Sequence, residues 1–392
     1  MRMSGQTSSG TDAGSVPIGD RIMKERPTIH DVAREAGVSA ATVSRLINGT
    51  ARVSSKTSHA IQEAMEKLDY VPSYLAQTFK RGSSRTIAFV IDDKALPLQP
   101  NIFTMTVLVG LNDVLSSEGY SIQIQHGVRK VSTAGGGKDT WLLDAWQRQE
   151  FAGVVMTNPT RNDPRIEMVR EGKIPAVVIG RHPDAGEIAQ VDIDNVGGTR
   201  AATEHLIRVG RGGIAYLGPE VLATAVDDRR RGYSEAMLSS GESSDGLRWI
   251  ATEGDGLEAF SFESAARAVY RATVTRPTWN GLVAFNDEMA LGAIRALEAR
   301  GYQVPSDVAV VGFDDMPFAR MTRPSLTTIH QNMRQLGQHT ARALLAALQG
   351  QVFANLTIQT VALVIRASSG AGLTDDMPVG ILNLSNAGSE VL

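Results

Sequence analysis

The pattern of apolar and polar residues first indicates a short amphipathic helix near the N-terminus. Apolar residues recur at positions i, i+3, i+4 and i+7 over residues 29–36, and Thr28 with Asp31 forms a capping pattern at the start. Gly37 suits a left-handed helix end, and Ser39 can cap a second helix. The pattern therefore predicts two short helices joined by a tight turn.

The second predicted helix spans Ala40–Ile47 and ends before Asn48-Gly49. Its apolar side chains point inward, and they are Val43, Leu46 and Ile47. We expect a small outward face that is polar apart from its alanines, formed by Ala40, Ala41, Ser44 and Arg45. A third helix begins at Ser54 or Ser55 and stops before Pro72.

Two short helices joined by a tight turn and supported by a third are typical of a helix-turn-helix. A three-helix bundle that contacts proteins would give a similar pattern, but the short second helix with its small face favours insertion into a DNA major groove.

Beyond residue 85, apolar strands alternate with helices. Predicted strands include Thr86–Ile91, Gly153–Met156, Ala176–Ile179 and Val308–Gly312, with helices such as Thr104–Glu118 between them. Repeated strand–helix units predict parallel sheets covered by helices, and the length suggests two such subdomains. The expected fold is therefore an all-α helix-turn-helix head followed by an α/β body of two doubly wound parallel-sheet subdomains.

Polar side chains gather just after the predicted strands, where ligands of such folds bind. Arg181, Asn286 and Asp314 each follow a strand, and Arg229 lies where a loop enters a helix. Carboxylate, amide and guanidinium groups in one cleft suit a polyhydroxylated ligand, because a carboxylate or a guanidinium can engage two adjacent hydroxyls at once.

A purely structural interpretation of these residues stays open. Asp287 and Asp314 could cap helices, and Arg229 could pair with Asp227 or Asp228. The spacing alone does not decide between this interpretation and a ligand site.

Composition narrows the class of protein. With 392 residues, 42% of them hydrophobic and 21% charged, the chain reads as an ordinary globular protein. It has no cysteine, which excludes disulfides and thiolate metal sites. No apolar run suits a membrane helix of about 20 residues, and residues 1–20 lack the apolar core of a secretory signal, so we expect a cytoplasmic protein without membrane contact. The usual nucleotide, hydrolase and metal motifs are missing, so we predict neither an enzyme nor a cofactor.

The charge distribution favours a nucleic-acid partner for the head. Residues 26–82 carry eight Lys or Arg against five Asp or Glu, a balance of +3, although the whole chain has a net charge of −3. A small basic head on an acidic body is a modest signal for a DNA-binding module.

The head segments RPTIHDVAREAGVSAATVSRLING, VSSKT and YVPSYLAQTF resemble the head of the lactose-repressor (LacI/GalR) family. The resemblance implies that Ser73–Lys80 is a hinge helix that enters the minor groove at the centre of a palindromic operator. Phe79 stands where the family has a wedging leucine, although packing of Phe79 on the body stays an alternative. The implied DNA contacts are Thr28, Ser39, Ala40, Ala41, Thr42, Ser44, Arg45, Asn48, Ser73, Ala76, Gln77, Phe79 and Lys80.

The resemblance continues through the body, which is expected to have a periplasmic-binding-protein-like fold. It implies effector contacts at four positions, and the strand-end pattern adds a fifth; together they are Phe103, Arg181, Arg229, Asn286 and Asp314. Ala223 and Ala225 replace polar residues of purine-binding members, which disfavours a purine. Gly254-Asp255-Gly256 lacks an aromatic residue often found there, which leaves one wall of the pocket undefined. Residues 372–392 lack a heptad repeat, which favours a homodimer over a coiled-coil tetramer.

We therefore expect a repressor of a carbohydrate-related operon, controlled by a sugar or sugar acid and bound to double-stranded DNA. A sugar-binding receptor without a regulatory role is the alternative, and the DNA-binding head disfavours it. The expected divisions are a tail (1–25), the head (26–72), a hinge helix and linker (73–84), an effector-binding and dimerisation body (85–370) and a second tail (371–392). Within the body we expect an N-subdomain at about 85–194 and 329–355 and a C-subdomain at about 195–328 and 356–370.

Overall fold

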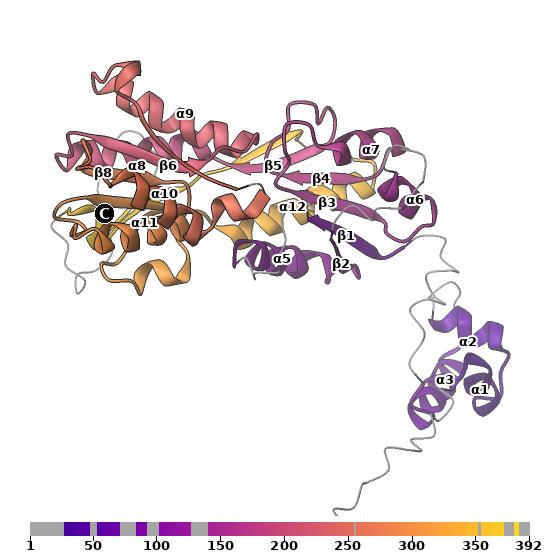
Figure 1. Ribbon diagram of the computed structural model, residues 1–392. Coiled ribbons are helices and arrows are strands. Elements are labelled where there is room, and N and C mark those ends of the chain that lie inside the picture. Colours follow the sequence, from indigo (N-terminus) through magenta and orange to yellow (C-terminus); the bar gives the residue numbers. More distant parts are fainter. Residues whose placement is uncertain are drawn as a thin grey trace, which may run out of the picture. The chain divides into compact units, whose positions relative to one another are not determined.

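The computed structural model describes residues 27–47, 53–70, 84–91, 102–126, 140–254, 256–351, 354–371 and 380–383. The chain separates into two compact units, Met1–Gly82 and Ser83–Leu392. We refer to the first as the head and to the second as the body, and each is described by itself (Figure 1).

The described part of the head contains three helices around a small apolar core. They are α1 (Ile29–Glu35), α2 (Ala40–Ile47) and α3 (Ser55–Lys67), the last capped by Ser54. The buried side chains that hold them together are Val32, Ala33, Val43, Ile61 and Ala64. The predicted helices are confirmed, and the inward face of α2 is wider than predicted, because it includes Ala40 and Ser44.

Local hydrogen bonds explain where the first two helices begin and end. The Thr28 amide donates to the Asp31 carboxylate at 2.9 Å, and the Thr42 amide donates to the Ser39 hydroxyl at 3.1 Å. Gly37 has φ +66°, the left-handed conformation that a glycine adopts without a Cβ clash. These are the caps that the sequence predicts.

The first sheet of the body is entirely parallel, with strand order β11-β5-β4-β3-β1-β2. Its strands are β1 (Thr86–Ile91), β2 (Ser121–His126), β3 (Gly153–Thr157), β4 (Ala176–Ile179), β5 (Ala189–Ile193) and β11 (Leu356–Gln359). Its helices are α5 (Ile102–Leu115), α6 (Trp141–Gln147), α7 (Pro164–Gly172) and α12 (Met333–Leu348). Alternate β1 residues enter two different cores: Ile87 and Phe89 pack with α5 and α12, and Ala88 and Val90 pack with α6 and α7.

The second sheet has strand order β13-β12-β10-β9-β8-β6-β7. Its strands are β6 (Ile214–Pro219), β7 (Arg248–Thr252), β8 (Gly281–Ala284), β9 (Ala309–Asp314), β10 (Thr327–His330), β12 (Ala362–Ile365) and β13 (Gly380–Asn383). The first five run parallel, and β12 and β13 are antiparallel to their neighbours. The helix pairs α8 (Asn195–Arg208) with α9 (Thr224–Ser239) and α10 (Phe262–Ala272) with α11 (Asp287–Ala299) cover the sheet (Figure 1). Short 3-10 helices are Ser244–Gly246, Gly256–Phe260, Pro317–Arg320 and Ala367–Ser369.

The structure differs from three of the expected boundaries. Helix α9 begins at Thr224, so Arg229 lies inside the helix and not where a loop enters it, as the sequence suggested. Strand β11 pairs with β5 of the first sheet. The expectation that the chain returns to the C-subdomain at about residue 356 is therefore wrong, because the chain crosses to the second subdomain only after β11. Strand β13 lies within the expected tail and pairs with β12, because an antiparallel ladder extends the second sheet there.

A glycine from each helix permits the close packing of α5 against α12. A Cβ added at Gly110 would overlap the backbone carbonyl oxygen of Arg334, and one at Gly337 would overlap that of Val107. The two backbones therefore approach each other where neither helix carries a side chain. This contact fixes α5 on the first sheet, next to the ends of the strands.

Substitution Gly110→Ala should lower the free energy of unfolding of the body by about 1–3 kcal/mol, because the added methyl forces two backbones apart. Gly212→Ala is the matched control, since nothing lies within 4 Å of an added Cβ at Gly212. Urea unfolding of both variants measures the difference. If Gly110→Ala and Gly212→Ala have equal free energies of unfolding, the contact between α5 and α12 does not require a glycine at position 110.

Candidate ligand site and candidate nucleic-acid interface

A cavity of about 260 Å³ lies between the two subdomains of the body, beyond the carboxyl ends of their strands. Arg181 follows β4 and Asp192 lies in β5, both in the first subdomain. Side chains of the second subdomain complete the lining. The structure brings all five residues of the predicted effector site, Phe103, Arg181, Arg229, Asn286 and Asp314, to the lining of this one cavity.

Arg229 is the most deeply embedded cation of the cavity, with a side chain only 7% exposed. Its Nε donates to the Asn195 side chain at 2.8 Å, and its Nη1 donates to the Phe285 carbonyl at 2.5 Å. The guanidinium lies 3.6 Å from the ring centroid of Phe313, a cation–π contact. Its Nη2 is 3.8 Å from Oδ1 of Asp314, so the ion pair is open enough for a ligand hydroxyl to join it.

Asp314 ends β9 in an unusual backbone conformation, with φ +116°. Gln331, which follows β10, donates from its side-chain amide to Oδ1 of Asp314 at 2.5 Å. Burial raises the pKa of Asp314 to about 6, and the Arg229 charge and the Gln331 hydrogen bond limit the rise. Asp314 therefore titrates near pH 6 and is mostly ionised at pH 7.

The structure decides against helix capping by the two aspartates. Asn286 caps α11 by accepting from the Met289 amide at 2.7 Å. Asp287 is fully buried, accepts hydrogen bonds from the Thr328 hydroxyl and the Met316 amide, and has its pKa raised well above its usual value by burial. The Asn286 side chain lines the cavity with both ends engaged: its oxygen caps α11, and its nitrogen donates to the Phe260 carbonyl.

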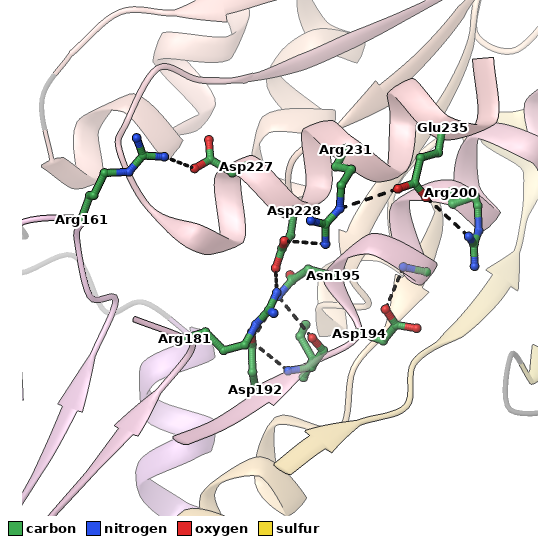
Figure 2. Close-up of polar contacts among 12 residues, drawn as sticks. Arg161, Arg181, Asp192, Asp194, Asn195, Arg200, Asp227, Asp228, Arg231 and Glu235 are labelled. Carbon is green, nitrogen blue, oxygen red and sulfur yellow. Dashed lines mark hydrogen bonds and ion pairs between the residues drawn. The ribbon is translucent and has the colours of Figure 1, made fainter. Parts of the chain in front are cut away.

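Arg229 does not pair with its neighbours on α9 either. Asp227 pairs with Arg161 at 3.0 Å, and Asp228 pairs with Arg181 and with Arg231 (Figure 2). Arg161 and Arg181 belong to the first subdomain and the two aspartates to α9 of the second. These ion pairs therefore join the two subdomains, which the sequence did not indicate.

Several lining residues were missed by the sequence prediction. Asp192 accepts from Arg181 Nε at 2.9 Å and from the Asn195 amide at 3.1 Å, and β5 was not predicted. Gln331 directly follows β10, and it gave no strand-end signal because that strand was not predicted either. The expectation of an undefined wall near Gly254 was wrong, because Phe260 lines the cavity and packs edge-on against Phe285 at 5.1 Å.

In the head, the structure corrects two predicted DNA contacts, Ala40 and Ser44, which pack toward the core of the head. Ser44 is only 6% exposed, because it shares the inner stripe of α2 with Ala40 and Val43 at spacings i, i+3 and i+4. Ala41 and Arg45 are exposed on the other side of the helix. The outward face that can reach DNA is therefore narrower than expected.

The remaining predicted head residues fall into two groups. The hydroxyls of Thr28, Ser39 and Thr42 take part in helix capping. The predicted contacts that lie outside the described residues are Asn48, Ser73, Ala76, Gln77, Phe79 and Lys80.

Other kinds of site find no support in the described part of the chain. There, no group of three or more His, Asp or Glu side chains is arranged to hold a metal ion. None of the described helices combines the length and apolar character needed to span a bilayer.

Comparison with known proteins matches both units to characterised families. Residues 28–73 match the family of bacterial regulatory proteins, lacI family, and residues 203–369 match the periplasmic binding protein-like domain. The HTH-type transcriptional regulator CelR of Thermobifida fusca is 34% identical over 331 residues, 84% of this chain and 94% of that protein. The ribose operon repressor of Halalkalibacterium halodurans is 30% identical over 322 residues, 82% of this chain and 90% of that protein.

Solved structures give the same picture. A lac repressor dimer bound to operator and the anti-inducer ONPF has a TM-score of 0.75 and 26% identity, covering 88% of this chain and 99% of that one. A complex of transcriptional regulator CelR with cellobiose has a TM-score of 0.61 and 30% identity, covering 88% of this chain and 100% of that one.

The raised pKa of Asp314 predicts a pH-dependent effect of Asp314→Asn. The folded state holds the Asp314 proton more tightly than the unfolded chain, so this stabilisation is present below pH 3.8 and is lost as pH rises through about 6. Asparagine does not titrate. The variant should therefore gain up to about 3 kcal/mol relative to wild type between pH 4 and pH 7, measured by urea unfolding at both values. If the difference in unfolding free energy between the variant and wild type stays constant with pH, the pKa of Asp314 is not raised in the folded state.

Proposed function

The chain belongs to the lacI family of bacterial regulatory proteins, and from this premise we propose that it is a repressor of a carbohydrate-related operon. It binds a palindromic operator as a homodimer, and a small sugar-like effector in the body cavity changes its affinity for DNA. A regulator of this kind acts in the cytoplasm, where the bacterial chromosome lies. The DNA-binding head is what distinguishes it from a sugar receptor.

The observation that carries this proposal is the position of the cavity between the two subdomains. Arg181 and Asp192 line it from the first subdomain, and Arg229 and Asp314 line it from the second. A ligand that contacts both sides is bound more tightly in one relative placement of the subdomains than in another. Binding in the cavity is thereby coupled to the arrangement of the body, and through it to DNA binding.

The chemistry of the cavity supports a sugar as ligand. Arg229 Nη2 offers a donor and the Asp314 carboxylate an acceptor, a pair that can engage adjacent hydroxyls. Phe260 and Phe285 supply apolar walls for the carbon face of a ring. Ala223 and Ala225 line the cavity with methyl groups, which disfavours a purine. Two solved relatives of this fold contain cellobiose and ribose.

An exposed apolar face on α5 supports the homodimer. Ile102, Met105 and Val109 are 40%, 45% and 51% exposed, and their spacing places them on one side of the helix. Ile124 of the edge strand β2 is 50% exposed. A second copy of the chain is the partner we propose for this face, in keeping with the dimer seen for the lac repressor. Two copies would present two heads to the two halves of a palindrome.

Arg45→Ala should weaken operator binding by roughly 1–3 kcal/mol, the value of a good contact between a side chain and a base. Arg34→Ala is the matched control, because it removes the same charge from α1. Mobility-shift titration on an operator selected from random DNA gives both affinities. If both variants lose the same amount of operator affinity, Arg45 acts only through its charge and makes no specific contact with a base.

Asp314→Ala should leave operator affinity unchanged and abolish its response to the sugar that a thermal-shift screen of carbohydrates identifies. The carboxylate is required to hold the ligand hydroxyls, whereas the head lies in the other compact unit. Calorimetry of the sugar and mobility shift of the operator test the two halves of this statement. Unimpaired sugar binding would place the effector elsewhere.

A further inference from the structure

The cavity contains more negative than positive charge. Its charged lining residues are Arg181, Arg229, Asp192, Glu288 and Asp314, so two guanidiniums face three carboxylates. Asp228 lies directly behind Arg181 and adds a fourth carboxylate to the same cluster. What decides the selectivity of such a site is whether either guanidinium remains available to a ligand.

Arg181 is already paired from both subdomains. Its Nε donates to Asp192 at 2.9 Å, and its Nη2 contacts the carboxylate of Asp228. Figure 2 shows Arg181 between these two residues, with Asp228 also held by Arg231. The side chains of Asp192 and Asp228 are only 6% and 5% exposed, so the pairing is little screened by solvent.

Arg229 keeps one nitrogen for a ligand, but that nitrogen faces a carboxylate. Two of its three nitrogens donate to Asn195 and to the Phe285 carbonyl, and its third faces Asp314. A carboxylate placed next to Arg229 would therefore also lie next to Asp314. An anion placed at either guanidinium would therefore lie next to a carboxylate that already pairs with that guanidinium.

On the premise of the sugar-effector function proposed above, we propose that this cavity selects an uncharged sugar and rejects sugar acids. Arg181 is the specificity-determining residue, because Asp192 and Asp228 together neutralise it. A ligand carboxylate would lose its water and gain no unpaired cation in return, which makes its burial costly. A hydroxyl carries no such penalty and can both donate and accept.

Matched pairs of ligands test the selectivity on the full-length protein at pH 7. The pairs are glucose with glucuronate, galactose with galacturonate, and cellobiose with cellobionate, compared by thermal shift and then by calorimetry. The neutral member of each pair that binds should bind at least tenfold more tightly than its acid. An acid that binds as tightly as its neutral partner overturns the proposal. If no member of any pair binds, the sugar-effector function itself fails, which is a separate result.

Two variants test the role of Arg181 through the ratio of acid to neutral affinity, which cancels any general loss of folding. Asp228→Asn leaves Arg181 with one carboxylate and should narrow the discrimination by roughly tenfold. Arg181→Gln leaves the carboxylates without their cation and should widen it.

Asp227→Asn is the matched control. It makes the same charge change at the neighbouring position of α9, where the carboxylate pairs with Arg161 and neither residue lines the cavity. Its ratio of affinities should equal that of wild type. An equal change in Asp227→Asn and Asp228→Asn would mean that net charge alone sets the selectivity and would remove Arg181 from the proposed role.

Discussion

The compensation of one buried charge, that of Arg229, organises the centre of the body. A guanidinium with 7% exposure is unstable in a low-dielectric interior unless each nitrogen finds a partner. Those partners come from the start of α8, the end of β8 and the end of β9. Residues distant in sequence are thereby brought to one point. The same requirement places Asp314, with its raised pKa, where a ligand can reach it.

The path of the chain makes the geometry around Arg229 and Asp314 sensitive to how the two subdomains are placed. The chain passes to the second subdomain after β5, returns after β10 and crosses again after β11. Gln331 lies just after β10 and donates to Asp314, so a connecting segment touches the ligand site directly. From the first subdomain, Arg161 and Arg181 reach Asp227 and Asp228 of the second. Ligand binding and subdomain placement therefore depend on the same side chains.

Much of this follows from the sequence, and the exceptions have physical causes. Strands β1 and β4 have their predicted bounds, because continuous apolar runs in a buried parallel sheet are unambiguous. Ser44 was assigned to the wrong face of α2, since a small polar residue gives little indication of burial at the edge of a helical stripe. The partners of Arg181 could not be predicted, because a cross-subdomain ion pair leaves no periodic pattern in either segment.

The central claim is that the cavity and the operator site are thermodynamically linked, and reciprocity tests it most directly. If a sugar changes operator affinity by some factor, bound operator must change sugar affinity by the same factor. Calorimetry of the sugar against the free protein and against the protein saturated with operator gives one factor, and operator titration with and without sugar gives the other. The account predicts two equal factors that differ from one. Sugar affinity that is unaffected by operator would contradict it.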